Sequence, residues 1–380
     1  MTVIAVLACL VWAWLWLFHG RFWQAGPVLR AAPPASCPPA SCPPVDVVIP
    51  ARNEAETIAA VVRSLLAQDY AGPLRVVVVD DRSTDGTGDL ARAQDDGRML
   101  VVDGAPRPDG WSGKLWAVSQ GLARADAAWV LLTDADILHD PRHVSALVAK
   151  AERDRLDLVS EMVELRCASA AERALVPAFV YFFQMLYPFA RVNDPRSRVA
   201  AAAGGTMLVR AEALTRAGGI ARIRGRLIDD VALARVLKER GRIWLGHSLL
   251  ARSVRPYPAP GDVWRMVART AYVQLRRSPL LLAGTVAGLA VVWLAGPAAA
   301  LAGQGAGRWL GLLAYALSAA SVLPTLCRFR QSPFWALLMP LVATFYLAAT
   351  VGSAVDHHRG RGARWKDRAY TAAHPDAPAA

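Results

Sequence analysis

Cysteine and charged residues are both scarce in this chain. Its 380 residues include five cysteines, none at C-x-x-C spacing and none with a histidine at a ligand offset, so we expect neither a zinc site nor a disulfide framework. Charged residues make up 19% and hydrophobic residues 54%, which is too apolar for an ordinary soluble enzyme. These shortages indicate a reducing compartment and membrane segments.

Acidic residues are fewer than basic ones, and the formal net charge is +12. From Arg252 to Arg277 there are six arginines and one acidic residue, and from Asp356 to Arg368 five basic residues and two acidic ones. Both clusters flank apolar stretches, and no recognised nucleic-acid-binding module is present. We therefore expect the bilayer, with its anionic headgroups, as a partner and exclude nucleic acid.

The N-terminal apolar run, Val3 to Phe18, just reaches the length of a membrane-spanning helix. Arg21 follows it and no basic residue precedes it, so the positive-inside rule places the next segment in the cytoplasm. A secretory signal peptide would carry its charge on the other side. We predict an anchor rather than a leader.

Three further apolar stretches follow Ser278, at Leu280–Ala302, Leu310–Leu326 and Phe334–Val351. If all three crossed the membrane, the basic tail would lie outside, against the positive-inside rule. One stretch is therefore expected to be re-entrant or interfacial. Phe334–Val351, with Pro340 in its middle, is the first candidate.

Between these apolar ends the pattern alternates between strand and helix, which predicts a mostly parallel sheet covered by helices on both faces. A proline-rich repeat before it reads as an extended spacer. The predicted strands are Val45–Ile49, Leu74–Val79 and Trp129–Thr133, and the helices Ala55–Gln68, Thr84–Ala93 and Pro141–Arg153. The predicted parts are an anchor (1–20), a linker (21–44), an α/β domain (45–249), a basic interfacial segment (250–279), membrane segments (280–352) and a basic tail (353–380).

Polar motifs follow the predicted strands, where ligands bind in open α/β sheets. Asn53 and Glu54 follow the first strand. Asp81 follows the second and is suited to a ribose or base, although Ser83 or Thr84 there could equally cap the next helix. Two carboxylates, at Asp134 and Asp136, follow the third.

Buried carboxylates at such spacing are costly unless a cation binds them. A divalent metal shared with the phosphates of a ligand meets that need, and a solvated loop is the alternative. Later in the chain, Asp229 and Asp230 open a predicted helix, Val231–Arg240, either as a general base or as helix-start acids.

The ordered set Pro50-x-x-Asn53-Glu54, Asp80-Asp81-x-Ser83-Thr84-Asp85, Gly113-Lys114 and Asp134-x-Asp136 resembles family-2 glycosyltransferases with a GT-A fold. The resemblance implies a nucleotide-sugar donor and Mg or Mn. It implies that Asp136 binds the metal, Asp230 beside Asp229 is the base, and Gly205 and Thr206 face the acceptor. The donor would contact Pro50, Asn53, Glu54, Asp81, Lys114 and Asp134.

Processive members carry Gln-x-x-Arg-Trp after the acidic pair, and this chain departs from that pattern. Arg265 and Arg269 lie at a suitable distance, and Gln274-x-x-Arg277 ends in serine instead of tryptophan. These residues either bind the acceptor or departing diphosphate, or contact headgroups from an interfacial helix. The departure favours transfer of a single sugar over polymer synthesis.

Finer features resemble the hopanoid-biosynthesis-associated glycosyltransferases and, more distantly, ceramide glucosyltransferases. These features are the Gly110-Trp111-Ser-Gly113-Lys114 and Arg269-Thr-Ala-Tyr-Val-Gln segments. The expected function is inverting transfer from a UDP-sugar to a membrane lipid, a hopanoid by this resemblance, at the cytoplasmic face of a bacterial inner membrane. The alternatives are a polyisoprenyl-phosphate glycosyltransferase and a non-catalytic nucleotide-binding scaffold.

Overall fold

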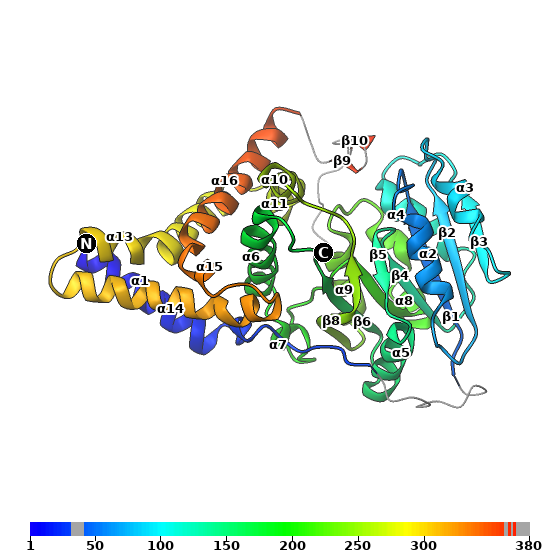
Figure 1. The fold of residues 1–380 in the computed structure, drawn as a ribbon, viewed down its shortest axis with the longest axis horizontal. Coiled ribbons are helices and arrows are strands. Elements are labelled where there is room, and N and C mark those ends of the chain that lie inside the picture. Colours follow the sequence, from blue (N-terminus) through cyan, green and yellow to red (C-terminus); the bar gives the residue numbers. More distant parts are fainter. Residues whose placement is uncertain (32–41, 361–363, 366–367, 370–380) are drawn as a thin grey trace.

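The computed structural model describes residues 1–31, 42–360, 364–365 and 368–369. An α/β domain built on one sheet lies beside a group of long apolar helices drawn from both ends of the chain (Figure 1). Residues 32–41 of the predicted linker lie outside the described residues. Its first part is no free spacer, because Phe22 and Leu29 are buried and Leu29 donates a backbone hydrogen bond to His247.

Eight strands form the central sheet, in the order β3-β2-β1-β4-β7-β6-β8-β5. The sheet is mixed: β7 runs antiparallel to β4 and β6, and β5 antiparallel to β8, while the other four pairings are parallel. The strands are β1 Val45–Ala51, β2 Leu74–Asp80, β3 Met99–Asp103, β4 Trp129–Thr133, β5 Ile137–His139, β6 Leu158–Glu164, β7 Thr206–Arg210 and β8 Ile243–Ser253.

This topology brings many strand ends to one edge of the sheet. The carboxyl ends of β1, β2, β4, β6 and β8 lie there together with the start of β7, because Thr133 at the end of β4 pairs with Thr206 at the start of β7. Residues 250–253, which the sequence assigned to an interfacial segment, are the end of β8. The polar loops that follow these strands therefore converge.

Helices cover both faces of the sheet, as predicted. Core residues of α2 and α5 pack on one face, and core residues of α4, α8 and α9 on the other. Their bounds are α2 Ile58–Leu66, α3 Thr87–Arg92, α4 Gly113–Leu122, α5 His143–Asp154, α6 Ala170–Leu186, α7 Phe189–Val192, α8 Ala211–Arg216 and α9 Asp229–Lys238.

Two of these helices begin later than predicted because their first residues are held in loops. Thr84 donates its backbone N–H to the Asn53 side chain, and Asp85 accepts from Ala55. Gly86, at φ 87°, then turns the chain into α3. The same bonds keep residues 55–57 out of α2.

The apolar helices are α1 Thr2–Phe18, α12 Pro279–Leu289, α13 Ala295–Ala302, α14 Ala306–Arg328, α15 Phe334–Leu337 and α16 Met339–His358. A π-helical turn at Ala290–Leu294 joins α12 to α13. Within the part of the chain that the structure describes, three stretches are long and apolar enough to cross a membrane: Pro279–Ala302, Ala306–Arg328 and Met339–His358. The helix α1, at 17 residues, is shorter. Pro340 lies in the first turn of α16, where proline is tolerated, so it does not interrupt the helix as its place in the sequence suggested.

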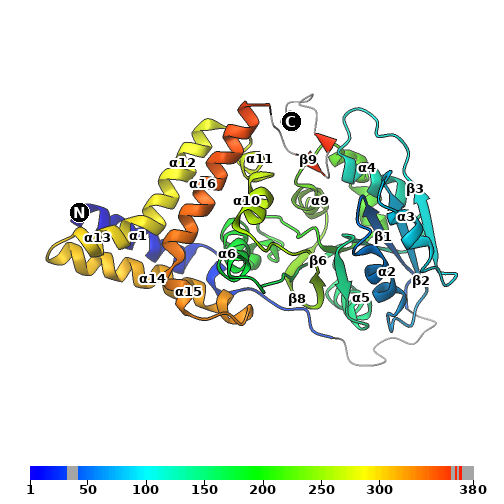
Figure 2. The ribbon, with the colours of Figure 1, turned by 45° about the horizontal axis from the view of Figure 1, so that its top comes forward.

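The apolar helices pack into one hydrophobic cluster together with α6. The indole of Trp12 on α1 donates to the carbonyl of Val292 in the π-helical turn at 2.8 Å, which joins α1 to the α12–α13 bend. Two short helices, α10 Pro260–Ala268 and α11 Ala271–Gln274, pack against α16 and lie between it and the α/β domain (Figure 2). The helix α16 therefore lies close to the polar edge of the sheet.

Candidate active site

A cleft of about 790 Å³ lies between the polar edge of the sheet and the helices α10, α11 and α16. The α/β domain contributes a wall of charged side chains, and the helices contribute a wall of mixed aromatic and polar ones. The first wall includes Pro50, Glu54, Lys114, Asp134, Asp136, Asp229 and Arg255, and the second Tyr257, Trp264, Arg265, Arg269, Ser353, Asp356 and His357.

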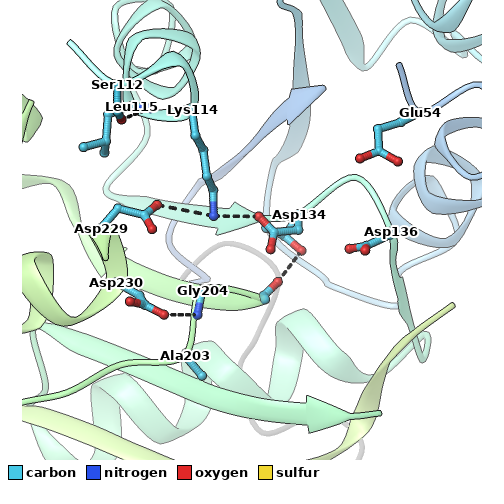
Figure 3. Close-up of polar contacts among 12 residues, drawn as sticks. Glu54, Ser112, Lys114, Leu115, Asp134, Asp136, Ala203, Gly204, Asp229 and Asp230 are labelled. Atoms are coloured by element: carbon cyan, nitrogen blue, oxygen red, sulfur yellow. Dashed lines mark hydrogen bonds and ion pairs between the residues drawn. The ribbon is translucent and has the colours of Figure 1, made fainter. Parts of the chain in front are cut away.

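Lys114 lies at the centre of the charged wall that the α/β domain contributes, which we call the acidic wall (Figure 3). Its Nζ lies 2.8 Å from Asp134 Oδ1 and 3.3 Å from Asp229 Oδ2. Ser112 caps the helix that carries it, because its hydroxyl accepts the N–H of Leu115 at 3.2 Å. Burial alone would lower the pKa of Lys114, but the two carboxylates outweigh it and raise the pKa, so the amine stays protonated.

Opposing effects also act on the pKa of Asp134. Burial raises the pKa of Asp134, the ion pair with Lys114 opposes that shift, and the nearby charge of Asp136 adds to it, with a raised pKa as the result. Its backbone N–H donates to the carbonyl of Gly205 at 3.3 Å. The carboxylate is therefore held between the β4 end and the β7 start with its charge only partly compensated.

Asp136 and Glu54 share one partner, Arg255. The guanidinium reaches Asp136 Oδ2 at 2.5 Å through Nε and Glu54 Oε1 at 2.8 Å through Nη2. Burial lowers the pKa of Arg255, but the charges of Asp136 and Glu54 raise it overall. Nothing in the basic cluster of the sequence distinguishes Arg255, which lies two residues after the end of β8, from the other arginines, so its role could not be predicted.

Asp230 lies at the start of α9, next to Asp229 and Gly204 (Figure 3), and it is not among the residues that line the cleft. Its carboxylate accepts the N–H of Gly204 at 2.9 Å and of Val231 at 2.7 Å. Burial, followed by the charge of Asp229, raises the pKa of Asp230 to about 7. Burial and the like charge of Asp229 therefore outweigh the stabilisation that a helix N-terminus gives to an ionised carboxylate.

Gly204, one residue before the predicted Gly205, makes this contact. A Cβ at Gly204 would lie 3.3 Å from Asp230 Oδ2 and 3.4 Å from Lys114 Nζ. Both side chains therefore lie close to the Gly204 backbone. Thr206 is fully buried inside the sheet and does not line the cleft. Thr206 is therefore not placed to contact a ligand in the cleft.

Two predicted donor residues lie behind the cleft wall. Asp81 is fully buried, and Arg52 lies 3.9 Å from its carboxylate and donates to its carbonyl at 2.6 Å. Asn53, at φ 49°, bonds through its backbone N–H to Ser83 and through its side chain to Thr84. These bonds join the loops after β1 and β2 into one unit that supports Glu54.

The two pairs of residues predicted to bind the acceptor or diphosphate lie in different places in the structure. Arg265 and Arg269 on α10 line the cleft, and Arg265 pairs with Asp262 at 2.5 Å. Gln274 on α11 instead donates to the Tyr187 hydroxyl at 2.5 Å, and neither it nor Arg277 lines the cleft. Only the first set is placed to meet a ligand there.

The cleft suits a cation that is completed by a ligand. Among the residues that the structure describes, no three His, Cys, Asp or Glu side chains are grouped closely enough to hold a metal by themselves. The acidic wall nevertheless offers hard oxygen donors at Asp134 and Asp136. Mg²⁺ is commonly held by one or two carboxylates together with substrate phosphates, and this donor set fits that arrangement.

Comparison with known proteins identifies the domain. Residues 46–217 match the sequence profile of glycosyl transferase family 2. The chain carries a family 2 glycosyltransferase domain. The matched residues include the loops from Pro50 to Asp136 and the start of β7. Asp229, Asp230 and the α10–α16 helices lie beyond them.

The family 2 domain is similar to several bacterial proteins. It is 36% identical over 109 residues to an N-acetylglucosaminyltransferase of Azorhizobium caulinodans, 34% over 143 residues to the succinoglycan biosynthesis protein ExoO of Rhizobium meliloti, and 37% over 92 residues to 4,4'-diaponeurosporenoate glycosyltransferase of Staphylococcus aureus. These matches cover 28%, 35% and 24% of this chain and 26%, 39% and 23% of those proteins. The chain thus matches well under half of each relative.

The fold itself has a solved counterpart. The mannosyltransferase PcManGT from Pyrobaculum calidifontis, in complex with GDP-Man and Mn²⁺, superposes with a TM-score of 0.57 at 20% identity, over 95% of this chain and 99% of that one. A likeness of this kind speaks for the fold alone. It confirms the predicted GT-A class with additional apolar helices.

Proposed function

We propose that this protein transfers a sugar, with inversion, from a nucleotide-sugar donor to a membrane lipid. The observation that carries the proposal is the cleft. Most of its acidic wall, from Pro50 to Asp136, lies within the residues that match glycosyl transferase family 2, and its opposite wall is built by α10, α11 and the apolar helix α16. A site between such walls can receive a charged, soluble donor and an acceptor that stays in the bilayer.

The donor side is assigned to the acidic wall. Glu54, Lys114 and Asp134 would contact the sugar and nucleotide, and Asp136 would hold a divalent cation, Mg²⁺ or Mn²⁺. Such a cation would neutralise charge on the departing nucleoside diphosphate. Arg255, which bridges Glu54 and Asp136, is placed to donate charge-assisted hydrogen bonds to the same group.

The base is assigned to Asp230, which follows the cleft-lining Asp229 but does not line the cleft itself, so the acceptor hydroxyl would have to reach past Asp229. Ionised, it takes the proton from the acceptor hydroxyl, whose oxygen attacks the anomeric carbon while the bond to the diphosphate breaks and its electron pair leaves with that group. A pKa near 7 suits a base at neutral pH. Asp229, which faces the cleft, holds Lys114 in place.

A topology follows from the ends of the apolar helices. Met1 and the turn at 303–305 lie at one end of the helical group, far from the α/β domain (Figure 1). At the other end, the carbonyl of Phe18 accepts from Arg191 at 2.7 Å, and Phe329 packs against the domain core. We propose that α1, α12–α13 and α14 cross the membrane, with the domain in the cytoplasm.

The remaining pair, α15 and α16, fits a re-entrant hairpin. The Tyr315 hydroxyl, midway along α14, donates to the carbonyl of Leu337 at 2.6 Å, so the chain after α14 turns back to about half depth. Ser353 and His357, at the other end of α16, line the cleft. This arrangement keeps the tail on the cytoplasmic side and satisfies the positive-inside rule.

The acceptor is proposed to be a lipid hydroxyl, and a hopanoid is the candidate that the sequence resemblance offers. The staphylococcal relative, named for 4,4'-diaponeurosporenoate, makes an apolar acceptor plausible for this domain. The test is to incubate membranes containing the protein with labelled UDP-sugars and total lipid extract, and to identify the product by mass spectrometry. Loss of label transfer in Asp136→Ala membranes is the control.

Arg265 and Arg269 also suit a polyisoprenyl-phosphate acceptor, whose phosphate they would bind. Such an acceptor needs little base catalysis, so full activity of Asp230→Asn would favour it. Titration of the protein with UDP and Mn²⁺, followed by a donor-hydrolysis assay, distinguishes both kinds of glycosyltransferase from a non-catalytic nucleotide-binding scaffold. Binding without donor hydrolysis or transfer to any lipid would contradict the proposed enzyme.

A further inference from the structure

A buried chain of hydrogen bonds lies behind the acidic wall, and the proposed mechanism does not use it. Glu161 Oε2 on β6 lies 2.5 Å from His143 Nε2, His143 Nδ1 lies 2.8 Å from His139 Nδ1, and His139 Nε2 lies 3.2 Å from Thr133 Oγ1. Thr133 Oγ1 lies 2.9 Å from the carbonyl of Gly205. The four side chains are 0–5% exposed.

The Gly205 carbonyl fixes the direction of three of these hydrogen bonds, from Thr133 back to His143 Nδ1. A carbonyl only accepts, so the Thr133 hydroxyl donates to Gly205, and its oxygen then accepts from His139 Nε2–H. Neutral His139 has a bare Nδ1 as a result, which accepts from His143 Nδ1–H. Burial, with the charge of His143 second, holds the pKa of His139 well below its usual range and keeps it neutral.

The chain ends at a point that both catalytic elements share. The Gly205 carbonyl that accepts from Thr133 also accepts the N–H of Asp134 at 3.3 Å. The preceding residue, Gly204, donates its N–H to Asp230 at 2.9 Å. The orientation of these two glycine peptides therefore sets where the Asp134 turn and the Asp230 carboxylate lie relative to each other.

Packing alone does not account for four polar side chains in this place. Valine at position 133 would fill the same volume without a hydroxyl, and Glu161 Oε1 is buried without a partner among the described residues. Such burial is costly and is retained where it fixes one geometry. A role in alignment of the site accounts for the cost.

We propose that Glu161, His143 and His139 are positioning residues that fix the Thr133 hydroxyl on Gly205 and so align Asp134 with Asp230. This proposal rests on the proposed glycosyltransferase function. None of the three residues touches the donor or acceptor. They act through the two glycine peptides.

The test compares matched variants at both ends of the chain. Thr133→Val, which loses the hydroxyl, is expected to lower kcat roughly tenfold, the equivalent of about one hydrogen bond, with the Kd for UDP within about twofold of wild type. Thr133→Ser, which keeps it, is expected to retain kcat. Glu161→Gln keeps a hydrogen-bonding side chain opposite His143 Nε2 and is expected to behave like Thr133→Ser, whereas Glu161→Met should behave like Thr133→Val.

An unchanged kcat in Thr133→Val, or a parallel loss of kcat, UDP affinity and thermal stability, would overturn the positioning role. A second measurement needs neither turnover nor a folded variant. In ¹⁵N-histidine-labelled wild-type protein, NMR should show His139 protonated at Nε2 and His143 at Nδ1, and the reverse pattern would overturn the proposal. Absence of transfer by wild type would count against the proposed function, while the tautomers would still be readable.

Discussion

Asp230 shows how a side chain at a helix start can lose the advantage of the helix dipole. The dipole is worth about 1 kcal/mol near the surface, and one pKa unit corresponds to about 1.4 kcal/mol. Burial beside Asp229 raises the pKa of Asp230 to about 7, so these two effects together exceed the dipole. The group is then a protonated acid just below neutral pH and an ionised base just above it.

The pH dependence of transfer should report this ionisation. We expect kcat/KM to rise with pH and reach half its maximum near pH 7, because only the carboxylate form of Asp230 accepts a proton. Asp229→Asn removes a like charge, so the midpoint should move to lower pH. Initial rates between pH 5 and 9 measure this. If the midpoint is the same in wild type and in Asp229→Asn, a residue other than Asp230 is the base.

Asp230→Asn should bind UDP with Mn²⁺ as wild type does and lose roughly 10²- to 10⁴-fold in kcat, the usual contribution of a positioned base. The amide keeps the size of the carboxylate and can still accept the Gly204 N–H, so the fold should be retained. Titration calorimetry and initial rates are the measurements. Normal turnover would contradict the assignment.

Asp136→Asn should abolish transfer and remove the effect of Mn²⁺ on UDP binding, because an amide is a poor ligand for a hard cation in place of a carboxylate. Arg255 would keep Glu54 as its partner, so the protein should remain folded in membranes. Asp89→Asn, at an exposed acid on α3, is the matched control and should behave as wild type. If the activity of Asp136→Asn equals that of the control, transfer does not require a cation bound at Asp136.

At the scale of elements, the contact between α10 and α16 holds the second wall of the cleft. A Cβ at Gly352 would lie 2.6 Å from the Trp264 ring, so these helices approach closely only because position 352 has no side chain. Ser353, the next residue, accepts the N–H of Tyr272 on α11. Separation of these helices should widen the cleft where the acceptor is proposed to enter.

Gly352→Leu should therefore destabilise the protein by about 1–3 kcal/mol, the usual cost of overpacking, and lower transfer to lipid. Gly284→Leu on α12 is the matched control, because nothing lies within 4 Å of the position of its added Cβ. Thermal unfolding in detergent and lipid transfer measure the two effects. Equal behaviour of the two variants would show that the α10–α16 contact does not shape the cleft.

At the scale of the whole molecule, the proposed route of the chain through a membrane decides which side the tail occupies. From Tyr315 to Arg328, α14 advances about 20 Å, so the hydrogen bond to Leu337 shows that α15 returns deep along α14. A full crossing by α16 would place its end opposite the domain. The end of α16 lines the cleft of that domain instead.

Single cysteines introduced into a cysteine-free background should test this topology. Gln304→Cys, between α13 and α14, should react with a membrane-impermeant maleimide from the periplasmic side only. Ser332→Cys and Arg359→Cys should both react from the cytoplasmic side only. Reaction of Arg359→Cys from the periplasmic side would show that α16 crosses the membrane.

The sequence alone determined the parts of this protein whose patterns are local. Buried strands such as Trp129–Thr133 and apolar helices are periodic or continuous in the chain, and the structure confirms them with shifts of a few residues at most helix ends. The order of motifs from Pro50 to Asp136 also predicted the family 2 domain, which the profile match confirms. Local hydrophobic pattern and motif order need no knowledge of distant contacts.

Tertiary structure decided what depends on residues far apart in the chain. Arg255 meets Asp136 and Glu54 only because β8 ends at the same sheet edge as β4 and β1. The direction of the Asp230 pKa shift required its burial and the nearby charge of Asp229, which outweigh the helix start that the sequence did show. Electrostatic free energies depend on distance and burial in space, and neither is written in the spacing of residues along the chain.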